Sequence, residues 1–188
     1  MRPELVRHRL LQGLALMSLL WILGTGVVRA QGVELALLEL HRQDGELTLD
    51  FDARVTLPKS VEDAMQRGVP VYFVADVSLY RARWYWRDER VARVQRSWRV
   101  AYQPLTSTWR VGFGGFNQSF QTLVEALTVA SRSTRWKVAE LSQLDGDSKH
   151  YLEFSYRLDN SQLPSPMQLG LGSQSEWVLG VDRVLRLE

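Results

Sequence analysis

The chain of 188 residues contains no cysteine and only three histidines. The lack of cysteine excludes disulfides, thiol catalysis, thiolate metal sites and iron–sulfur chemistry. Two histidines, His41 and His150, lie outside the first thirty residues, each beside a predicted turn where we expect a solvent-exposed side chain. No phosphate-cradling glycine loop, G-x-S-x-G or H-E-x-x-H motif is present. We therefore predict a non-enzymatic protein with no cofactor and no metal site.

Two groups of carboxylates come closest to a chemical motif. Asp50 and Asp52 share the outer face of a predicted strand, where a pair could serve acid–base chemistry or hold a divalent cation. A solvated strand face, balanced by Arg54 or a cross-strand partner, explains the same pattern and is the interpretation that we prefer. The Asp-Gly-Asp segment at 145–147 is typical of a turn and lacks the other ligands of a calcium loop.

The first thirty residues have the order of a secretory leader. A basic start precedes the apolar stretch Leu10 to Val28, and Val28-Arg29-Ala30 offers small side chains at a cleavage site. We predict a signal peptide over residues 1–30 and export to the periplasm with Gln31 as the mature start. The alternative is an uncleaved inner-membrane anchor facing the periplasm, because the apolar stretch is close to the length that spans a bilayer.

The charge of the chain is concentrated in that leader. It holds four arginines and one glutamate, so residues 31–188 carry 19 basic and 20 acidic side chains. A nearly neutral chain gives no argument for nucleic-acid binding. Residues 31–188 suit a single β-rich domain. Within it, residues 161–175 contain Pro164 and Pro166, and we predict an irregular surface crossover there.

The remaining sequence alternates with a strand period. In Glu46 to Leu57 every second residue is apolar, and Asp44-Gly45 predicts a tight hairpin with Val33 to His41. In the next hairpin the large apolar residues change parity after Leu79, which predicts either a β-bulge near Leu79 to Arg81 or a sheet edge at which the covered side changes.

Two helices and five further strands complete the prediction. We expect a short helix capped by Ser60 and ended by Gly68, and a longer helix from Ser119. The further strands are expected at 91–103, 109–113, 136–141, 149–158 and 177–187. About eight antiparallel strands with one short and one longer helix predict the α+β class, mainly antiparallel β, as a curled sheet or a β-sandwich.

One local feature departs from ordinary composition, the predicted hairpin from Arg81 to Arg99. It contains seven arginines, no lysine, two acids and the four large aromatics Trp84, Tyr85, Trp86 and Trp98. Arginine and tryptophan together suit lipid head groups, phosphates, an acidic protein surface or a membrane interface. Outward arginine alternating with inward tryptophan gives the same pattern from packing alone. The candidate binding surface consists of Arg81, Arg83, Trp84, Trp86, Arg87, Arg93, Arg96 and Trp98.

Three segments in order resemble one family. They are A-M-Q-R-G-V-P-V-Y-F (Ala64 to Phe73), R-V-A-Y-Q-P-L-T-S-T-W-R-V (Arg99 to Val111) and L-D-N-S-Q-L-P-S-P (Leu158 to Pro166). With the leader, they are similar to the bacterial exported family described as domain of unknown function 4390. The resemblance brings no chemistry and no site residue. It implies an accessory role in the cell envelope, linked to a two-component sensor kinase.

We therefore expect a non-enzymatic exported envelope protein that acts as an accessory binding module. Its expected partner is an envelope protein or an anionic envelope component, not nucleic acid. Membrane contact is expected only through the leader or peripherally. The alternative is a periplasmic carrier of a small apolar ligand or lipid, because a curled sheet with two helices can enclose a pocket.

Overall fold

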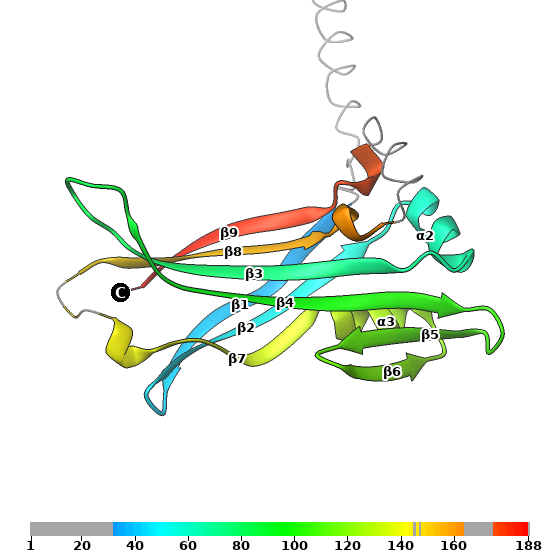
Figure 1. The fold of residues 1–188 in the computed structure, drawn as a ribbon, viewed down its shortest axis with the longest axis horizontal. Helices are drawn as coiled ribbons and strands as arrows, with labels where there is room; N and C mark the ends of the chain where they lie inside the picture. The colour runs from blue at the N-terminus through cyan, green and yellow to red at the C-terminus, as the bar shows by residue number, and fades with distance from the viewer. Residues whose placement is uncertain (1–31, 145, 147, 164–174, 188) are drawn as a thin grey trace, which may run out of the picture. The chain divides into compact units, whose positions relative to one another are not determined.

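The computed structural model describes residues 32–144, 146, 148–163 and 175–187. The predicted leader and most of the predicted crossover at 161–175 lie outside this part of the chain, as do Asp145 and Asp147. The described residues form nine strands, two α-helices and three short 3₁₀ helices (Figure 1). Their bounds are β1 Gly32–Gln43, β2 Glu46–Thr56, α2 Lys59–Gln66, β3 Val71–Arg81, β4 Glu89–Gln103, β5 Thr108–Phe113, β6 Phe116–Phe120, α3 Leu123–Ala130, β7 Arg132–Glu140, η1 Leu141–Gln143, β8 His150–Leu158, η2 Asn160–Gln162, η3 Ser175–Trp177 and β9 Gly180–Leu187.

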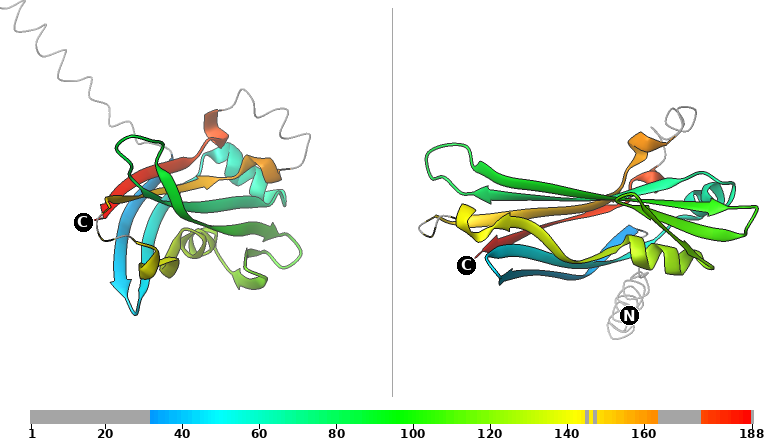
Figure 2. Two further views of the ribbon diagram at one scale, coloured as in Figure 1. Left: turned by 60° about the vertical axis from the view of Figure 1, so that its left-hand side comes forward. Right: turned by 60° about the horizontal axis from the view of Figure 1, so that its bottom comes forward.

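The strands form two antiparallel sheets. The smaller has the order β1-β2-β7, and the larger has the order β6-β5-β4-β3-β8-β9. Every pairing is antiparallel. Figure 2 shows the two curved sheets facing each other, with α3 between β7 and the β4–β5 side of the larger sheet. The predicted class, α+β and mainly antiparallel β, is confirmed.

The alternation in β2 places its apolar side chains in the core. Leu47, Leu49 and Phe51 are fully buried, whereas the intervening polar residues are only partly covered. Asp44 and Gly45 have φ angles of 54° and 79°, which is the positive-φ pair that a tight hairpin turn requires. The first hairpin therefore forms as its sequence predicts.

The second hairpin, β3–β4, forms the centre of the larger sheet. β3 pairs with β4 on one side and with β8 on the other. The register shifts between Leu79, opposite Ala92, and Tyr80, opposite Arg90, so the predicted bulge is confirmed. Beyond Arg81 the chain leaves the sheet, and residues 82–88 form a loop that we call the tip. The tip projects beyond the ends of β8 and β9 (Figure 1).

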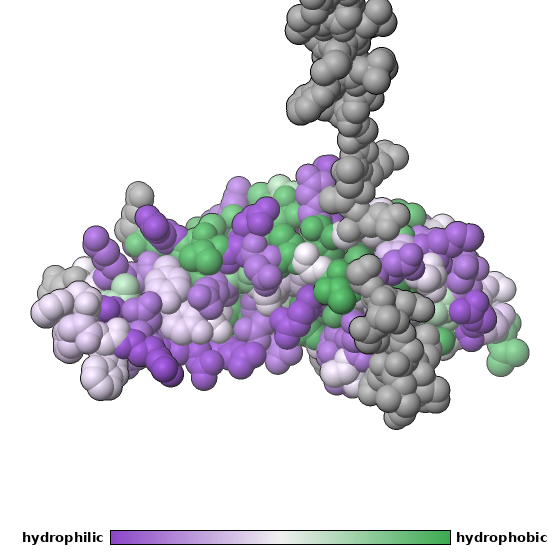
Figure 3. Space-filling model, turned by 90° about the horizontal axis from the view of Figure 1, so that it is seen from above, coloured by the Kyte–Doolittle hydropathy of each residue, from purple (hydrophilic) through white to green (hydrophobic). Residues whose placement is uncertain are grey.

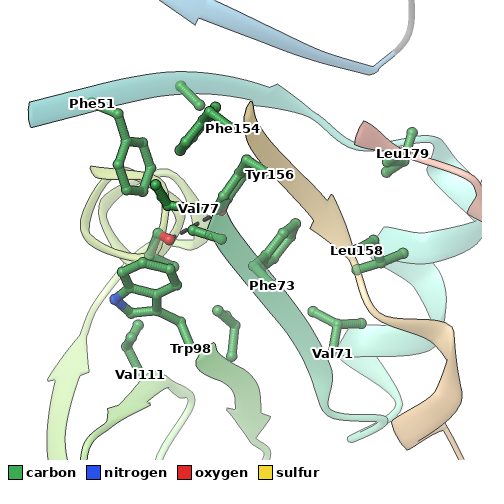
Figure 4. Close-up of a cluster of buried hydrophobic side chains, with 14 of the residues drawn as sticks. Phe51, Val71, Phe73, Val77, Trp98, Val111, Phe154, Tyr156, Leu158 and Leu179 are labelled. Atoms are coloured by element: carbon green, nitrogen blue, oxygen red, sulfur yellow. Dashed lines mark hydrogen bonds between the residues drawn. The ribbon is translucent and has the colours of Figure 1, made fainter. Parts of the chain in front are cut away.

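An aromatic cluster joins the two sheets. The ring centroid of Phe51 in β2 lies 6.0 Å from that of Trp98 in β4 and 6.3 Å from that of Trp136 in β7. It lies 5.1 Å from the ring centroid of Phe154 and 5.7 Å from that of Tyr156, both in β8. Figure 4 shows Phe51, Trp98, Phe154 and Tyr156 pointing toward one another from opposite layers. Each such pair contributes about 0.5–1.5 kcal/mol beyond the burial of its surface. Rings from both sheets therefore fill the space around Phe51.

The short helix differs from its prediction at its start. α2 begins after Pro58 with no side-chain cap, whereas Ser60 was the predicted cap. Ser60 Oγ instead donates a hydrogen bond to Glu176 Oε2 of η3, 2.6 Å away. The fixed φ of proline suits a helix start without a side-chain acceptor, so the prediction of Ser60 as cap is wrong.

The longer helix is shorter than predicted because a strand precedes it. Gly114 and Gly115, with φ angles of 54° and 87°, turn the chain tightly, and β6 then pairs with β5. This additional strand takes Ser119 and Phe120 out of the predicted helix. α3 begins instead at Thr122, whose side chain accepts from the Glu125 backbone amide in a capping box.

Tyr156 provides a test of the packing between the sheets. Its hydroxyl donates to the Ala130 carbonyl at 3.0 Å in the core (Figure 4, dashed line). Tyr156→Phe should lower the free energy of unfolding at pH 7 by about 1–2 kcal/mol, because a buried carbonyl loses its donor. The half-buried Tyr102, replaced by Phe, is the control.

The same residue predicts a pH dependence. Burial raises the pKa of Tyr156 well above its ordinary value of 10. The folded chain therefore keeps this proton at a pH where the unfolded chain releases it, and stability should fall as the pH rises above 10. Urea titrations should show this fall reduced in Tyr156→Phe. An equal fall in both proteins would contradict the assignment.

Candidate functional site

The tip carries three consecutive aromatic side chains in solvent. Trp84, Tyr85 and Trp86 are 94%, 69% and 73% exposed. The rings of Trp84 and Tyr85 meet edge to face with centroids 4.8 Å apart. Single exposed apolar residues are common on protein surfaces, but large aromatics are normally placed where they lose water. Three in succession mark the tip as a candidate contact surface.

The Asp88 carboxylate links the tip to β8 by two hydrogen bonds, which we call the brace. Asp88 Oδ1 accepts from the Arg83 backbone amide at 3.0 Å, and Asp88 Oδ2 accepts from the Tyr151 hydroxyl of β8 at 2.8 Å. The bond from Arg83, followed by that from Tyr151, lowers the pKa of Asp88. Burial raises the pKa of Tyr151 to about 12, and its bond to Asp88 acts in the same direction. Asp88 therefore stays a charged acceptor, and Tyr151 stays a neutral donor, across the physiological pH range.

The base of the tip is tied to the sheet by two further contacts. The Ala82 backbone amide donates to the Lys149 carbonyl at 2.8 Å, and Glu89 pairs with both Arg81 and Arg83. Arg87 and Arg90 are exposed and form no ion pair within the described chain. The tip thus presents unpaired positive charge next to its aromatic residues.

The structure separates the rest of the predicted surface from the tip. Arg93 lies on the outer face of the sheet, where its Nε and Nη2 lie 3.0 and 2.7 Å from Asp76 Oδ2. This pairing raises the pKa of Arg93. Trp98 is 3% exposed and belongs to the aromatic cluster, because strand alternation turns it inward.

Arg96 lies where the two sheets meet. Its guanidinium is 5.5 Å from the Phe113 ring centroid and 5.0 Å from that of Trp136, and it donates to Ser133 of β7. Burial lowers the pKa of Arg96. The eight predicted residues are therefore not one surface, and this is a correction to the sequence-based prediction. Arg81, Arg83, Trp84, Trp86 and Arg87 lie in or at the base of the tip, whereas the other three stabilise the sheets.

A hollow beside the tip was not predicted. It has a volume of about 860 Å³ and is lined by residues that include Ala82, Lys149, Tyr151, Val184 and Arg186. These residues come from three separate parts of the chain, and only the pairing of β3 with β8 and of β8 with β9 brings them together. Lys149 and Arg186 therefore become candidate contacts beside the tip. Tyr85 of the tip is a further candidate that the predicted surface did not include.

His150 and Asp50 take part in the packing and hydrogen bonding of the fold. His150 is only 6% exposed, so the predicted exposure of this residue is wrong; it starts β8 opposite Arg81 and Leu187 on neighbouring strands. Asp50 accepts from the Arg135 backbone amide at 2.6 Å, where Arg135 has a φ of 46°. Within the described residues no group of three or more potential ligands could hold a metal ion. No helix among them has the length and apolar character to cross a membrane.

Arg96 and Arg87 form a matched pair for testing the division between structural and tip arginines. Arg96→Gln should lower the free energy of unfolding by about 1–2 kcal/mol, because its contacts with two aromatic rings are lost. Arg87→Gln should change it by less than about 0.5 kcal/mol, as expected of an exposed side chain. Urea denaturation of both variants measures the difference, and equal effects would contradict the division.

Asp88 should control the order of the tip without controlling the fold. Asp88→Ala removes both hydrogen bonds of the brace, so amide hydrogen exchange over residues 83–88 should become faster. Exchange in β2 and β8 should stay unchanged. Asp63→Ala, which alters an exposed ion pair on α2, is the control. Unchanged exchange at Arg83 in the Asp88 variant would show that the carboxylate is not the brace.

Comparison with known proteins places the chain in a family without assigned chemistry. A family model described as Domain of unknown function (DUF4390) matches residues 30–186. No match was found among curated proteins or among solved structures. The match spans the described domain, including both sheets and the tip. The chain therefore belongs to the DUF4390 family.

Proposed function

We propose that this protein is a non-enzymatic binding module of the cell envelope that contacts its partner with the tip of the β3–β4 hairpin. The observation that carries the proposal is the exposure of Trp84, Tyr85 and Trp86 on a braced loop. Aromatic side chains held in a fixed position lose little conformational entropy on binding, which is why they dominate many binding surfaces. The partner is an envelope protein, such as a sensor kinase, or an anionic envelope component.

The packing between the sheets favours a binding module over the alternative of a small-ligand carrier. A carrier needs an interior pocket lined by apolar groups. The interior around Phe51 is instead occupied by the rings of Trp98, Trp136, Phe154 and Tyr156. The exposed aromatic surface lies outside the core, at the end of the sheet, where a large partner has access.

The test is affinity capture of the tagged full chain from intact, crosslinked cells. Replacing Trp84, Tyr85 and Trp86 together by Ala should reduce recovery of the partner to less than about a tenth, because truncated aromatic anchors typically each cost a large part of the binding energy. The matched control replaces Leu105 and Phe116 by Ala. These residues are 101% and 80% exposed, but Leu105 lies in the turn between β4 and β5 and Phe116 is the first residue of β6.

The capture experiment has two decisive outcomes. A crosslinked component that is lost from the tip variant and kept by the control supports the proposal. Equal recovery of every component by the two variants overturns it. The intact mass of the captured protein is measured at the same time, and a bound small molecule that persists in the tip variant would favour the carrier instead.

A further inference from the structure

The tip has the chemical character of a membrane-interface anchor. Tryptophan and tyrosine prefer the head-group region of a bilayer, because their rings are apolar and their N–H or O–H groups stay hydrated. Trp84, Tyr85 and Trp86 offer both properties on one projecting loop. In Figure 3 the tip forms the pale left-hand end of the molecule, and hydrophilic residues in purple follow directly behind it.

The surface behind the tip is basic. Cross-strand pairing aligns Arg90, Tyr80, Tyr151 and Arg186 in one row over four strands. The two tyrosine rings of this row stack with centroids 5.2 Å apart. The neighbouring row contains the buried Leu79, so the Arg–Tyr–Tyr–Arg row lies on the opposite, outer face of the sheet. Two cations thus flank an aromatic platform beside the tip.

The hollow beside the tip continues this basic surface. Lys149 and Arg186 line it, and none of its described lining residues is acidic. Val184, which is 62% exposed, adds an apolar wall. Phosphate oxygens fit such a site because arginine and lysine supply several N–H donors and positive charge. The apolar wall suits the glycerol and the upper acyl chain that accompany a phosphate in a phospholipid.

We propose that the tip docks on an anionic phospholipid bilayer, with Trp84, Tyr85 and Trp86 in the interfacial layer and the basic residues behind them on the lipid phosphates. This inference rests on the proposed function and names its partner. We favour a lipid surface over a protein because the charges around the exposed aromatics are mainly positive, which suits a surface of anionic head groups. Exposed aromatic and basic side chains can contact the fluid head groups of a lipid surface.

The absence of cysteine allows a direct test. Tyr85→Cys creates one thiol in the full chain, which can carry an environment-sensitive fluorophore. The labelled protein is mixed with vesicles of phosphatidylcholine alone or of phosphatidylcholine with phosphatidylglycerol. Emission should move to shorter wavelength only with the anionic vesicles, and raising the salt concentration should reverse the shift, because salt screens exposed charges.

Two sets of variants test the contribution of the tip. All of them keep the leader, so a difference between variants cannot come from the leader. Trp84→Ala with Trp86→Ala should abolish the emission shift. Lys149→Gln with Arg186→Gln should raise the anionic-lipid fraction needed for half of the shift by about twofold or more, since each basic residue near the surface adds to lipid attraction. The charge-matched control is Lys59→Gln at the start of α2 with Arg67→Gln just after its end, near the other end of β3. A label at Leu105→Cys is the positional control.

The outcomes distinguish this inference from the proposed function. A salt-sensitive shift at position 85 that requires both the aromatics and the anionic lipid supports it. An equal shift with neutral and anionic vesicles overturns the assignment to anionic lipid. If position 85 stays in water while the tip variant still loses a crosslinked protein in cells, the partner is a protein and the proposed function stands without this inference. Absence of both effects overturns both.

Discussion

The structure depends on one interaction, the packing of Phe51 against rings from both sheets. Phe51 lies on β2 of the smaller sheet, and its ring meets Trp98, Phe154 and Tyr156 of the larger one. Without cysteine, no disulfide holds the layers together, so the burial of these rings and of the aliphatic residues around them supplies the cohesion. The cluster joins β2 and β7 of the smaller sheet to β4 and β8 of the larger one, and the tip extends from β4 and its partner β3.

The same packing explains how the β3–β4 hairpin carries two kinds of aromatic residue. β3 pairs on both sides and is buried along most of its length, so the hairpin is held firmly at its base. The bulge after Leu79 changes the register, and beyond Arg81 no further strand covers the chain. Trp98 therefore enters the core, while Trp84 and Trp86 remain in water on the tip. Position along one hairpin thus decides whether an aromatic side chain is buried or exposed.

The sequence predicted those parts of the fold in which local patterns decide the structure. The alternation of β2, the Asp44-Gly45 turn and the bulge near Leu79 follow from side-chain period and turn chemistry alone. β6 was missed because five mostly polar residues carry no strand signal, and only pairing with β5 orders them. Because β6 includes Ser119 and Phe120, α3 begins later than the predicted start at Ser119.

The candidate site was predicted only in part. Composition singled out the arginine- and tryptophan-rich hairpin, but composition does not say which side of a strand is covered. Arg96 became a contact between the sheets because β7 lies beside β4, which no local pattern reveals. Lys149 and Arg186 lie beside the tip because strands that are far apart in the sequence pair with each other. Local sequence thus identified the hairpin, and long-range pairing determined which of its residues lie at the candidate site.

The central claim is that the tip serves binding and not folding. The most direct measurement replaces residues 82–88 with Asn-Gly, which joins the paired Arg81 and Glu89 by a two-residue turn. The account predicts a free energy of unfolding within about 1 kcal/mol of the parent, since the tip adds little to the core, together with loss of the partner from crosslinked cells. A shortened chain that still captures its partner, or that no longer folds cooperatively, would contradict the account.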